Sequence, residues 1–229
     1  MSGIAEAGEV LLPSSKPVIR LRKASPGRMV MLCEGKRGRG FFICRDCGAG
    51  FQTSQARHLS PLGVPCPGKL QSDVALGHEF VTDVLQLQFL LPCAVADDPL
   101  WLAFSLAYAL VEGAAGVLDV QSNDINTTVS HADPTSIPSL VLYDAVAGGA
   151  GLVAQLEDED LLRRSLAAAL SRVSGACGCG DDTSCYGCLR GYRNQFAHSN
   201  LRRGPAKRYL EALLAAWPER IPDSSCLVR

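Results

Sequence analysis

The sequence lacks the features of a secreted protein. Its N-terminus has no basic segment followed by an apolar one, so we expect a cytoplasmic protein. Disulfides are rare in that compartment, and the ten cysteines of the chain therefore indicate metal ligands. A large net charge is also lacking, because 22 Lys and Arg residues stand against 23 Asp and Glu residues.

A complete nucleotide-binding loop is missing as well. Residues Gly63–Lys69 superficially resemble a P-loop, but Leu70 follows the lysine where Ser or Thr would bind Mg²⁺. Pro65 and Pro67 also remove backbone amides that would bind phosphate. Because the sequence has no intact ATP-binding motif, we expect that this chain does not hydrolyse ATP by itself.

One long apolar run, residues 99–116, could nearly span a bilayer. Asp97, Asp98 and Pro99 form an N-terminal helix signal at its start, and Ser105, Tyr108 and Glu112 interrupt its apolar surface. We therefore predict a helix buried in the core of the protein, and we expect no membrane partner.

Four cysteines gather near the C-terminus in the spacing C-x-C-x5-C-x2-C. Thiolates at this density can surround one zinc ion as a tetrahedron, and the intervening glycines let the backbone curl around it. Disulfides or a redox C-x-x-C motif are the alternatives, but a redox motif usually lies between a strand and a helix, whereas residues 176–184 read as a glycine-rich loop. His198 could replace one thiolate. The four predicted ligands are Cys177, Cys179, Cys185 and Cys188.

A second possible tetrahedron lies nearer the N-terminus, with the spacing C-x2-C-x10-H-x7-C. The apolar strand 41–44 leads into a Cys-x-x-Cys-Gly turn, which is typical of a zinc knuckle. The predicted ligands are Cys44, Cys47, His58 and Cys66. Cys33 or His78 could replace His58, whereas Cys93 and Cys226 have no partner at ligand spacing. Two zinc ions are therefore expected.

Both ends of the chain are basic and its middle is acidic. Residues 1–60 hold ten Lys and Arg against four Asp and Glu, residues 70–189 hold three against sixteen, and residues 190–229 hold eight against three. Arginines alternate with Tyr192 and Phe196 after the last cysteine of the cluster, a pattern that suits phosphate contact and base stacking. The alternative is that the arginines are only solvated and the aromatics pack the zinc module. The candidate nucleic-acid contacts are Arg190, Arg193, Arg202 and Arg203.

The hydrophobic pattern predicts an α+β fold, with a mixed sheet packed against helices and two zinc-stabilised loop modules. We expect strands near 17–22 (at a sheet edge), 84–90, 117–120, 125–129 and 140–144, and helices over 99–116, 157–173 and 205–217. The predicted segments are a flexible leader at 1–16, a zinc-knuckle region at 17–75, a core at 76–175, and a four-cysteine zinc module with the last helix at 176–229.

A glycine turn follows the predicted strand 140–144. Ala147–Gly151 then opens a helix, and such a turn could present free amides to an anion or could serve tight packing of helix on sheet. We favour packing because no lysine or hydroxyl follows at the expected place, and we expect Asp144 to act as a polar anchor.

Four polar residues suggest an alternative, enzymatic function. His78, Glu79, Asp83 and Asp144 could form a metal-dependent nuclease or nucleotide-processing site if they converged on one ion. Spacing alone does not show convergence, and polar residues at the entrance of a strand are the simpler interpretation.

The ordered set of motifs resembles the MrfA-type zinc-binding (MZB) domain family, which occurs at the C-terminal end of certain DNA helicases and in DrmB of the DISARM antiphage system. The resemblance extends over about residues 17–217. Its motifs are Cys44-x-x-Cys47-Gly48, then His58 and Cys66, Leu76–Leu85, Leu142–Asp144 with Gly148–Gly151, Ser184–Leu189, Tyr192-x-Asn194-Gln195, and His198.

Membership of this family would imply a bacterial protein tied to a superfamily 2 helicase, with the cysteines at 177–188 as its best-marked residues. The N-terminal cluster resembles the DrmB version. The helicase motor normally joined to the domain is absent, so we expect a stand-alone subunit or a fragment. The expected function is a non-catalytic module that docks onto a helicase and helps it hold or load DNA in antiphage defence. A purely structural assembly subunit is the remaining alternative.

Overall fold

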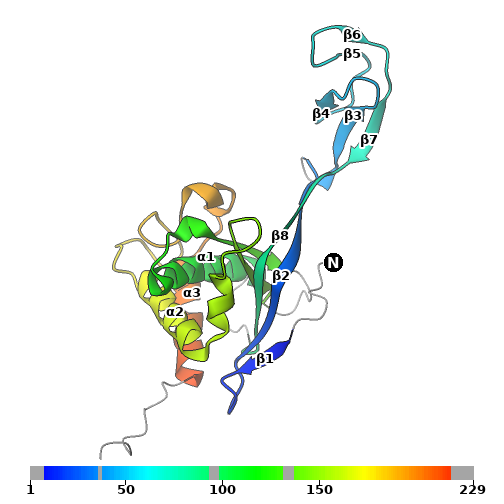
Figure 1. The fold of residues 1–229 in the computed structure, drawn as a ribbon. Helices are drawn as coiled ribbons and strands as arrows, with labels where there is room; N and C mark the ends of the chain where they lie inside the picture. The colour runs from blue at the N-terminus through cyan, green and yellow to red at the C-terminus, as the bar shows by residue number, and fades with distance from the viewer. Residues whose placement is uncertain (1–7, 36–37, 93–97, 131–136, 218–229) are drawn as a thin grey trace, which may run out of the picture. The chain divides into compact units, whose positions relative to one another are not determined.

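The chain divides into two units, Met1–Gly27 with Val81–Arg229 and Arg28–Phe80 (Figure 1). The structure is a computed structural model that describes residues 8–35, 38–92, 98–130 and 137–217. Cys93 and Cys226 lie outside the described residues. Strands β2 (Ile19–Cys33) and β8 (Leu76–Phe89) each contribute residues to both units.

A five-stranded sheet forms the framework of the larger unit. Its strand order is β1-β2-β8-β10-β9, where β1 is Glu9–Leu12, β10 is Ser139–Asp144 and β9 is Ile125–Ser130. Strand β1 pairs with β2, β8 with β10, and β10 with β9, each pair in the antiparallel direction. All six residues of β10 are buried, because this strand lies between two others and its apolar run Leu140–Tyr143 enters the core.

Three helices pack together beside this sheet (Figure 1). They are α1 (Pro99–Leu118), α2 (Glu159–Arg172) and α3 (Arg203–Ala216). The Asp98 carboxylate caps α1 by accepting hydrogen bonds from the amides of Leu100 and Trp101, as the sequence signal predicted. Helix α1 contacts β9, β10 and both other helices, so it lies at the centre of the unit.

By length and composition α1 could cross a membrane, but 61% of its most apolar window is buried inside the protein. Leu102, Leu106 and Leu110 recur along one face of the helix and are at most 2% exposed. The prediction of a core helix in this part of the chain is confirmed.

The smaller unit contains two short sheets. One has the order β4-β3-β7, with β3 at Phe41–Cys44, β4 at Gly50–Phe51 and β7 at Leu70–Val74. The other is a hairpin of β5 (His58–Leu59) and β6 (Pro65–Cys66). Strands this short bury few apolar side chains, so the folded state of this unit depends on the cysteine-rich cluster described below for its stability.

The α+β prediction is confirmed, with three local corrections. Strand β1 lies in the segment expected to be a leader, and its pairing places β2 inside the sheet and not at its edge. Helix α1 continues to Leu118, where a strand at 117–120 was expected. The glycine turn is followed by a short 3-10 helix, Val153–Glu157, and α2 begins only at Glu159.

The turn at Gly148–Gly151 binds an anion from within the chain. The Asp144 carboxylate accepts hydrogen bonds from the amides of Ala150, Leu152 and Val153 at 2.7–3.0 Å, and Asp83 accepts one from Gly151 at 2.8 Å. These carboxylates occupy the amides that an external anion would need. The expected role of Asp144 as a polar anchor is therefore confirmed.

A glycine of α1 sets how closely α1 approaches α2. A Cβ atom at Gly113 would lie 2.3 Å from the carbonyl oxygen of Ser165 and 2.7 Å from the amide nitrogen of Ala169. Both contacts are with the backbone of α2, which cannot move aside without shifting the helix.

We predict that Gly113→Ala lowers the free energy of unfolding by about 1–3 kcal/mol, because overpacking outweighs the gain in helix propensity. Gly116→Ala is the matched control, since Gly116 is exposed and has open space around it; this variant should gain about 1 kcal/mol. Urea denaturation followed by circular dichroism measures both. Equal stabilisation by the two substitutions would contradict the close helix contact.

Candidate metal centres

The four C-terminal cysteines converge on one point. The Sγ atoms of Cys177 and Cys179 are 3.4 Å apart, and Cys188 Sγ lies 3.8 Å from those of both Cys179 and Cys185. All four sulfurs lie within 4.8 Å of one another. Four thiolates bound tetrahedrally at about 2.3 Å from a zinc ion are about 3.8 Å apart, whereas a disulfide would need about 2.05 Å. The donor set is therefore suited to one zinc ion.

Backbone amides shape this loop around the sulfurs. The amides of Cys188, Leu189 and Arg190 all donate to the carbonyl of Cys185 at 3.0–3.1 Å, and the amide of Cys185 donates to Cys188 Sγ at 3.2 Å. Gly178 turns the chain with a φ of 77°, a conformation that glycine adopts without strain.

The thiols differ in their acidity before metal binds. The backbone amide of Cys179 lowers the pKa of Cys177 to about 7, whereas burial raises the pKa of Cys188 to about 12. Zinc binds the thiolate form, so its binding at this centre must displace a proton from Cys188 at neutral pH.

The N-terminal ligands also come together. Cys44 Sγ is 3.8 Å from Cys66 Sγ, and Cys47 Sγ is 3.4 Å from His58 Nε2. Tetrahedral zinc would place two thiolates about 3.8 Å apart and a thiolate and an imidazole nitrogen about 3.5 Å apart. The four ligand atoms lie within 4.8 Å of one another, so this set too is suited to zinc.

Short strands and one turn position these ligands. Cys44 ends β3, and the amide of Gly48 closes the turn by donating to the carbonyl of Cys44 at 2.9 Å. His58 and Cys66 face each other directly in the β5–β6 hairpin. The backbone amide of Cys47 lowers the pKa of Cys44 to about 7, which favours the metal-binding thiolate.

The alternatives to His58 and to a thiolate are not supported by this geometry. Cys33 is exposed and lies outside both ligand groups among the described residues. His198 points its Nε2 atom at Asn194 Oδ1 (2.8 Å) and at the carbonyl of Gly191 (3.0 Å), not at the cysteines. Two acceptors at Nε2 require that this nitrogen carries the proton.

Comparison with known proteins agrees with this geometry. Residues 106–189 match the family model of the MrfA Zn-binding domain (MZB). This part of the chain is therefore similar to that domain. The matched residues run from α1 to the end of the C-terminal cysteine cluster, so they include that centre, whereas the N-terminal centre lies outside them.

Two further proteins are similar over most of the chain. The crystal structure of the DUF1998 helicase MrfA bound to DNA matches 92% of this chain with a TM-score of 0.53 at 15% sequence identity, which shows a shared fold. The Druantia protein DruE of Escherichia coli (strain UMEA 4076-1) is 28% identical over 194 residues, covering 72% of this chain. The chain spans 24% of the helicase structure and 10% of DruE.

Arg203 connects the C-terminal metal loop to α3 and is buried. Its Nη2 atom donates to the carbonyl of Cys179 at 2.8 Å and pairs with Asp181, and its Nη1 donates to the carbonyl of Val173 at 3.3 Å. The residue is only 6% exposed. The structure does not support the prediction that Arg203 contacts nucleic acid, because its guanidinium is buried under the loop and bonded to Cys179, Asp181 and Val173.

The other three predicted arginines lie nearer the surface. Arg190 Nε donates to Ser184 Oγ at 3.1 Å, and Arg193 Nη1 contacts the carbonyl of Asn123 and Oδ1 of Asn126 at 3.2 and 3.1 Å. Arg202 Nη1 donates to the carbonyl of Ser199 at 2.6 Å. Arg193 is exposed and the other two are half-buried.

The four residues of the enzymatic alternative have structural roles. Asp144 and Asp83 bind the amides of the glycine turn, and Asp83 also accepts a hydrogen bond from Ser25. Glu79 forms an ion pair with Arg28 at 3.1 Å, and the ring of His78 stacks on that of Phe80. Carboxylates engaged in this way do not support a catalytic metal site.

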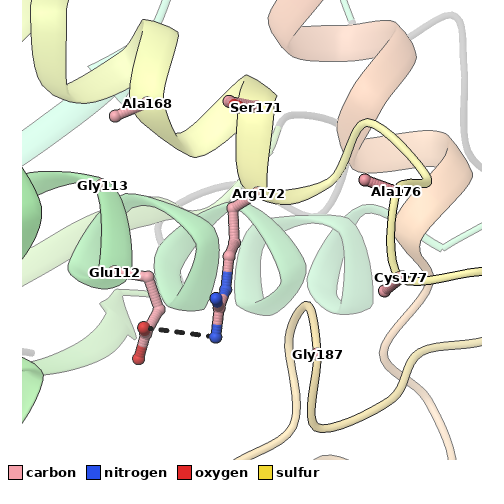
Figure 2. Close-up of a pocket in the computed structure, with 8 residues that line it drawn as sticks. All are labelled: Glu112, Gly113, Ala168, Ser171, Arg172, Ala176, Cys177 and Gly187. Atoms are coloured by element: carbon pink, nitrogen blue, oxygen red, sulfur yellow. Dashed lines mark ion pairs between the residues drawn. The ribbon is translucent and has the colours of Figure 1, made fainter.

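An open hollow of about 500 Å³ lies beside the C-terminal metal loop (Figure 2). Cys177, Ala176 and Gly187 line it from the loop, and Arg172 and Glu112 line it from α2 and α1. Arg172 pairs with Glu112 at 3.5 Å, and its Nε donates to the carbonyl of Cys188 at 3.1 Å. Arg172 thus attaches the metal loop to both helices. No spacing signal in the sequence indicates this role or that of Asp181.

We predict that Cys188→Ser or Cys185→Ser reduces the zinc content from two ions per chain to one, because the remaining ligands cannot close the tetrahedron. The C-terminal module should then unfold, with new protease cleavage sites between 174 and 202. Cys33→Ser is the control and should keep both ions. Inductively coupled plasma mass spectrometry gives the zinc content. Two ions in either ligand variant would show that the ligands are assigned wrongly.

We predict that His58→Ala lowers the zinc affinity of the N-terminal centre alone. One of the two zinc ions should then pass to a chelator at a lower chelator concentration than in the wild-type protein. His198→Ala removes the other candidate imidazole and should leave the chelator titration unchanged. The reverse pattern, with His198→Ala releasing zinc first, would overturn the ligand assignment.

Proposed function

We propose that this chain is a non-catalytic, zinc-stabilised accessory module that associates with a superfamily 2 DNA helicase and helps it hold or load DNA. The observation that carries the proposal is the MZB match, together with a fold shared over 92% of the chain with part of a helicase structure. A region that equals 24% of a helicase chain corresponds to an accessory part of such a protein.

The arrangement of charged residues favours a binding role over a catalytic one. The carboxylates considered for catalysis bind backbone amides or an arginine, so they support folding. From Thr183 to Leu210 the sequence has no Asp or Glu and has six Lys or Arg residues. A segment of this charge, held in place by a metal loop, favours contact with phosphates.

We propose the bacterial cytoplasm as its location and antiphage defence as its setting, with a DISARM-like system as one candidate. The motif resemblance to DrmB and the similarity to the Druantia protein DruE support the setting. A purely structural assembly subunit would make no DNA contact, and the experiment below separates the two functions.

A salt titration tests the DNA contact. The zinc-loaded full chain is titrated against a fluorescein-labelled 20-mer duplex and the equivalent single strand at 50–200 mM NaCl, with anisotropy as the readout. We expect the affinity for DNA to fall steeply as the salt concentration rises. The double variant Arg190→Ala/Arg193→Ala should bind more weakly, and its slope of log affinity against log salt should correspond to about one to two fewer phosphate contacts. Arg164→Ala removes an exposed arginine of α2 as the control. No binding at 50 mM NaCl would support the assembly subunit instead.

Native isolation from the source cells tests the helicase association. This chain should be recovered with, or as part of, a protein that carries helicase ATPase motifs and has DNA-stimulated ATPase activity. Recovery only with proteins that lack such motifs would contradict the association.

A further inference from the structure

The exposed aromatic side chains of the larger unit gather in one short segment. Among the residues the structure describes, the exposed tyrosines, tryptophans and phenylalanines are Tyr186, Tyr192 and Phe196, with exposed fractions of 65%, 86% and 67%. All three lie between the third zinc ligand of the C-terminal centre and the start of α3. Exposing large rings is unfavourable in water, so such a group indicates a binding surface.

Hydrogen bonds and one ring contact hold the segment that carries these rings. Asn194, only 5% exposed, accepts a hydrogen bond from the amide of Gly191 and donates one to the carbonyl of Leu189, both at 2.8 Å. His198 bonds to the same turn through Gly191 and packs edge-on against the ring of Tyr186 at 5.5 Å. A ligand would therefore meet rings that are already ordered, which lowers the entropic cost of binding.

Phe196 is supported from a second element. Its ring packs edge-on against Phe104 of α1 with the centroids 5.9 Å apart. The edge contact holds the ring in place while 67% of the residue remains exposed.

The charge around the rings is positive. Arg190, Arg193 and Arg202 alternate with the aromatics, and Arg203 is excluded because it is buried under the metal loop. Arg193 donates to the carbonyl of Asn123, and the carboxylate of the next residue, Asp124, accepts a hydrogen bond from the amide of Gln121. A groove for an apolar protein partner would need exposed large aliphatic side chains. Residues 177–217 expose none.

We infer that Tyr186, Tyr192 and Phe196 with Arg190, Arg193 and Arg202 form a stacking ledge for single-stranded DNA. Bases stack on the rings and phosphates contact the guanidinium groups, a combination that binds single strands with little sequence preference. A duplex keeps its base faces covered, so it cannot use the rings. This inference rests on the proposed function and names its substrate class and the residues involved.

The test compares two ligands that have the same phosphates and differ in their bases. The zinc-loaded full chain is titrated by anisotropy with fluorescein-labelled dT15 and with an abasic strand of equal length. Wild-type protein should bind dT15 at least about 5-fold more tightly than the abasic strand, because base stacking contributes at each ring.

Substitutions then separate rings from charges. Tyr192→Ala and Phe196→Leu should each weaken dT15 binding by about 5- to 100-fold, with an unchanged salt slope. Tyr192→Phe, which keeps the ring, should stay within about 2-fold of wild type, and Leu62→Ala, at a 90% exposed site of the other unit, should have no effect. Phe196→Leu keeps apolar contact with Phe104, so loss of folding does not explain its effect; circular dichroism and zinc content check this.

The outcomes distinguish this inference from the proposed function. Equal binding of dT15 and the abasic strand, or full affinity in both ring variants, overturns the stacking ledge. In that case loss of affinity in the arginine variant still supports DNA contact. Tighter binding of a duplex than of dT15 also overturns the ledge. No binding of any DNA by folded protein with two zinc ions overturns both.

Discussion

Two groups of closely spaced sulfurs are the constraint on which the structure depends. The four sulfurs of the C-terminal centre lie within 4.8 Å of one another and would repel strongly as free thiolates, and Cys188 and Cys44 are each only 1% exposed. A zinc ion removes this repulsion and satisfies the sulfurs. Structural zinc sites in small peptides contribute about 10–16 kcal/mol of apparent binding free energy at neutral pH, enough to order loops that have no hydrophobic core.

The C-terminal centre organises more than its own loop. Arg203 joins the carbonyl of Cys179 to the first turn of α3 and to the end of α2, while Arg172 joins the carbonyl of Cys188 to α2 and α1. The segment with the exposed aromatics begins inside this loop, at Tyr186, and continues to Phe196. The metal loop and the helices beneath it therefore fix the position of these rings. A structural ion can in this way support a binding surface that it does not itself contact.

The parts of the site that sequence could predict are those fixed by local spacing. Both ligand sets follow from the spacing of cysteines, with one histidine, along short stretches of the chain, and α1 follows from the Asp97-Asp98-Pro99 signal with its apolar run. The parts that sequence could not predict depend on distant residues. Strand β1 forms because β2 is available for pairing, and nothing in the run Arg202–Arg203 shows which arginine enters the interior. The glycine turn illustrates the same limit, since its amides bind an anion supplied by Asp144 and Asp83.

Metal analysis tests the account most directly. The purified full chain, with its zinc measured by native mass spectrometry and its free thiols titrated after unfolding, should contain two zinc ions and no disulfide. Chains without zinc whose clustered cysteines are paired as disulfides, yet which keep the same fold, would contradict the central claim.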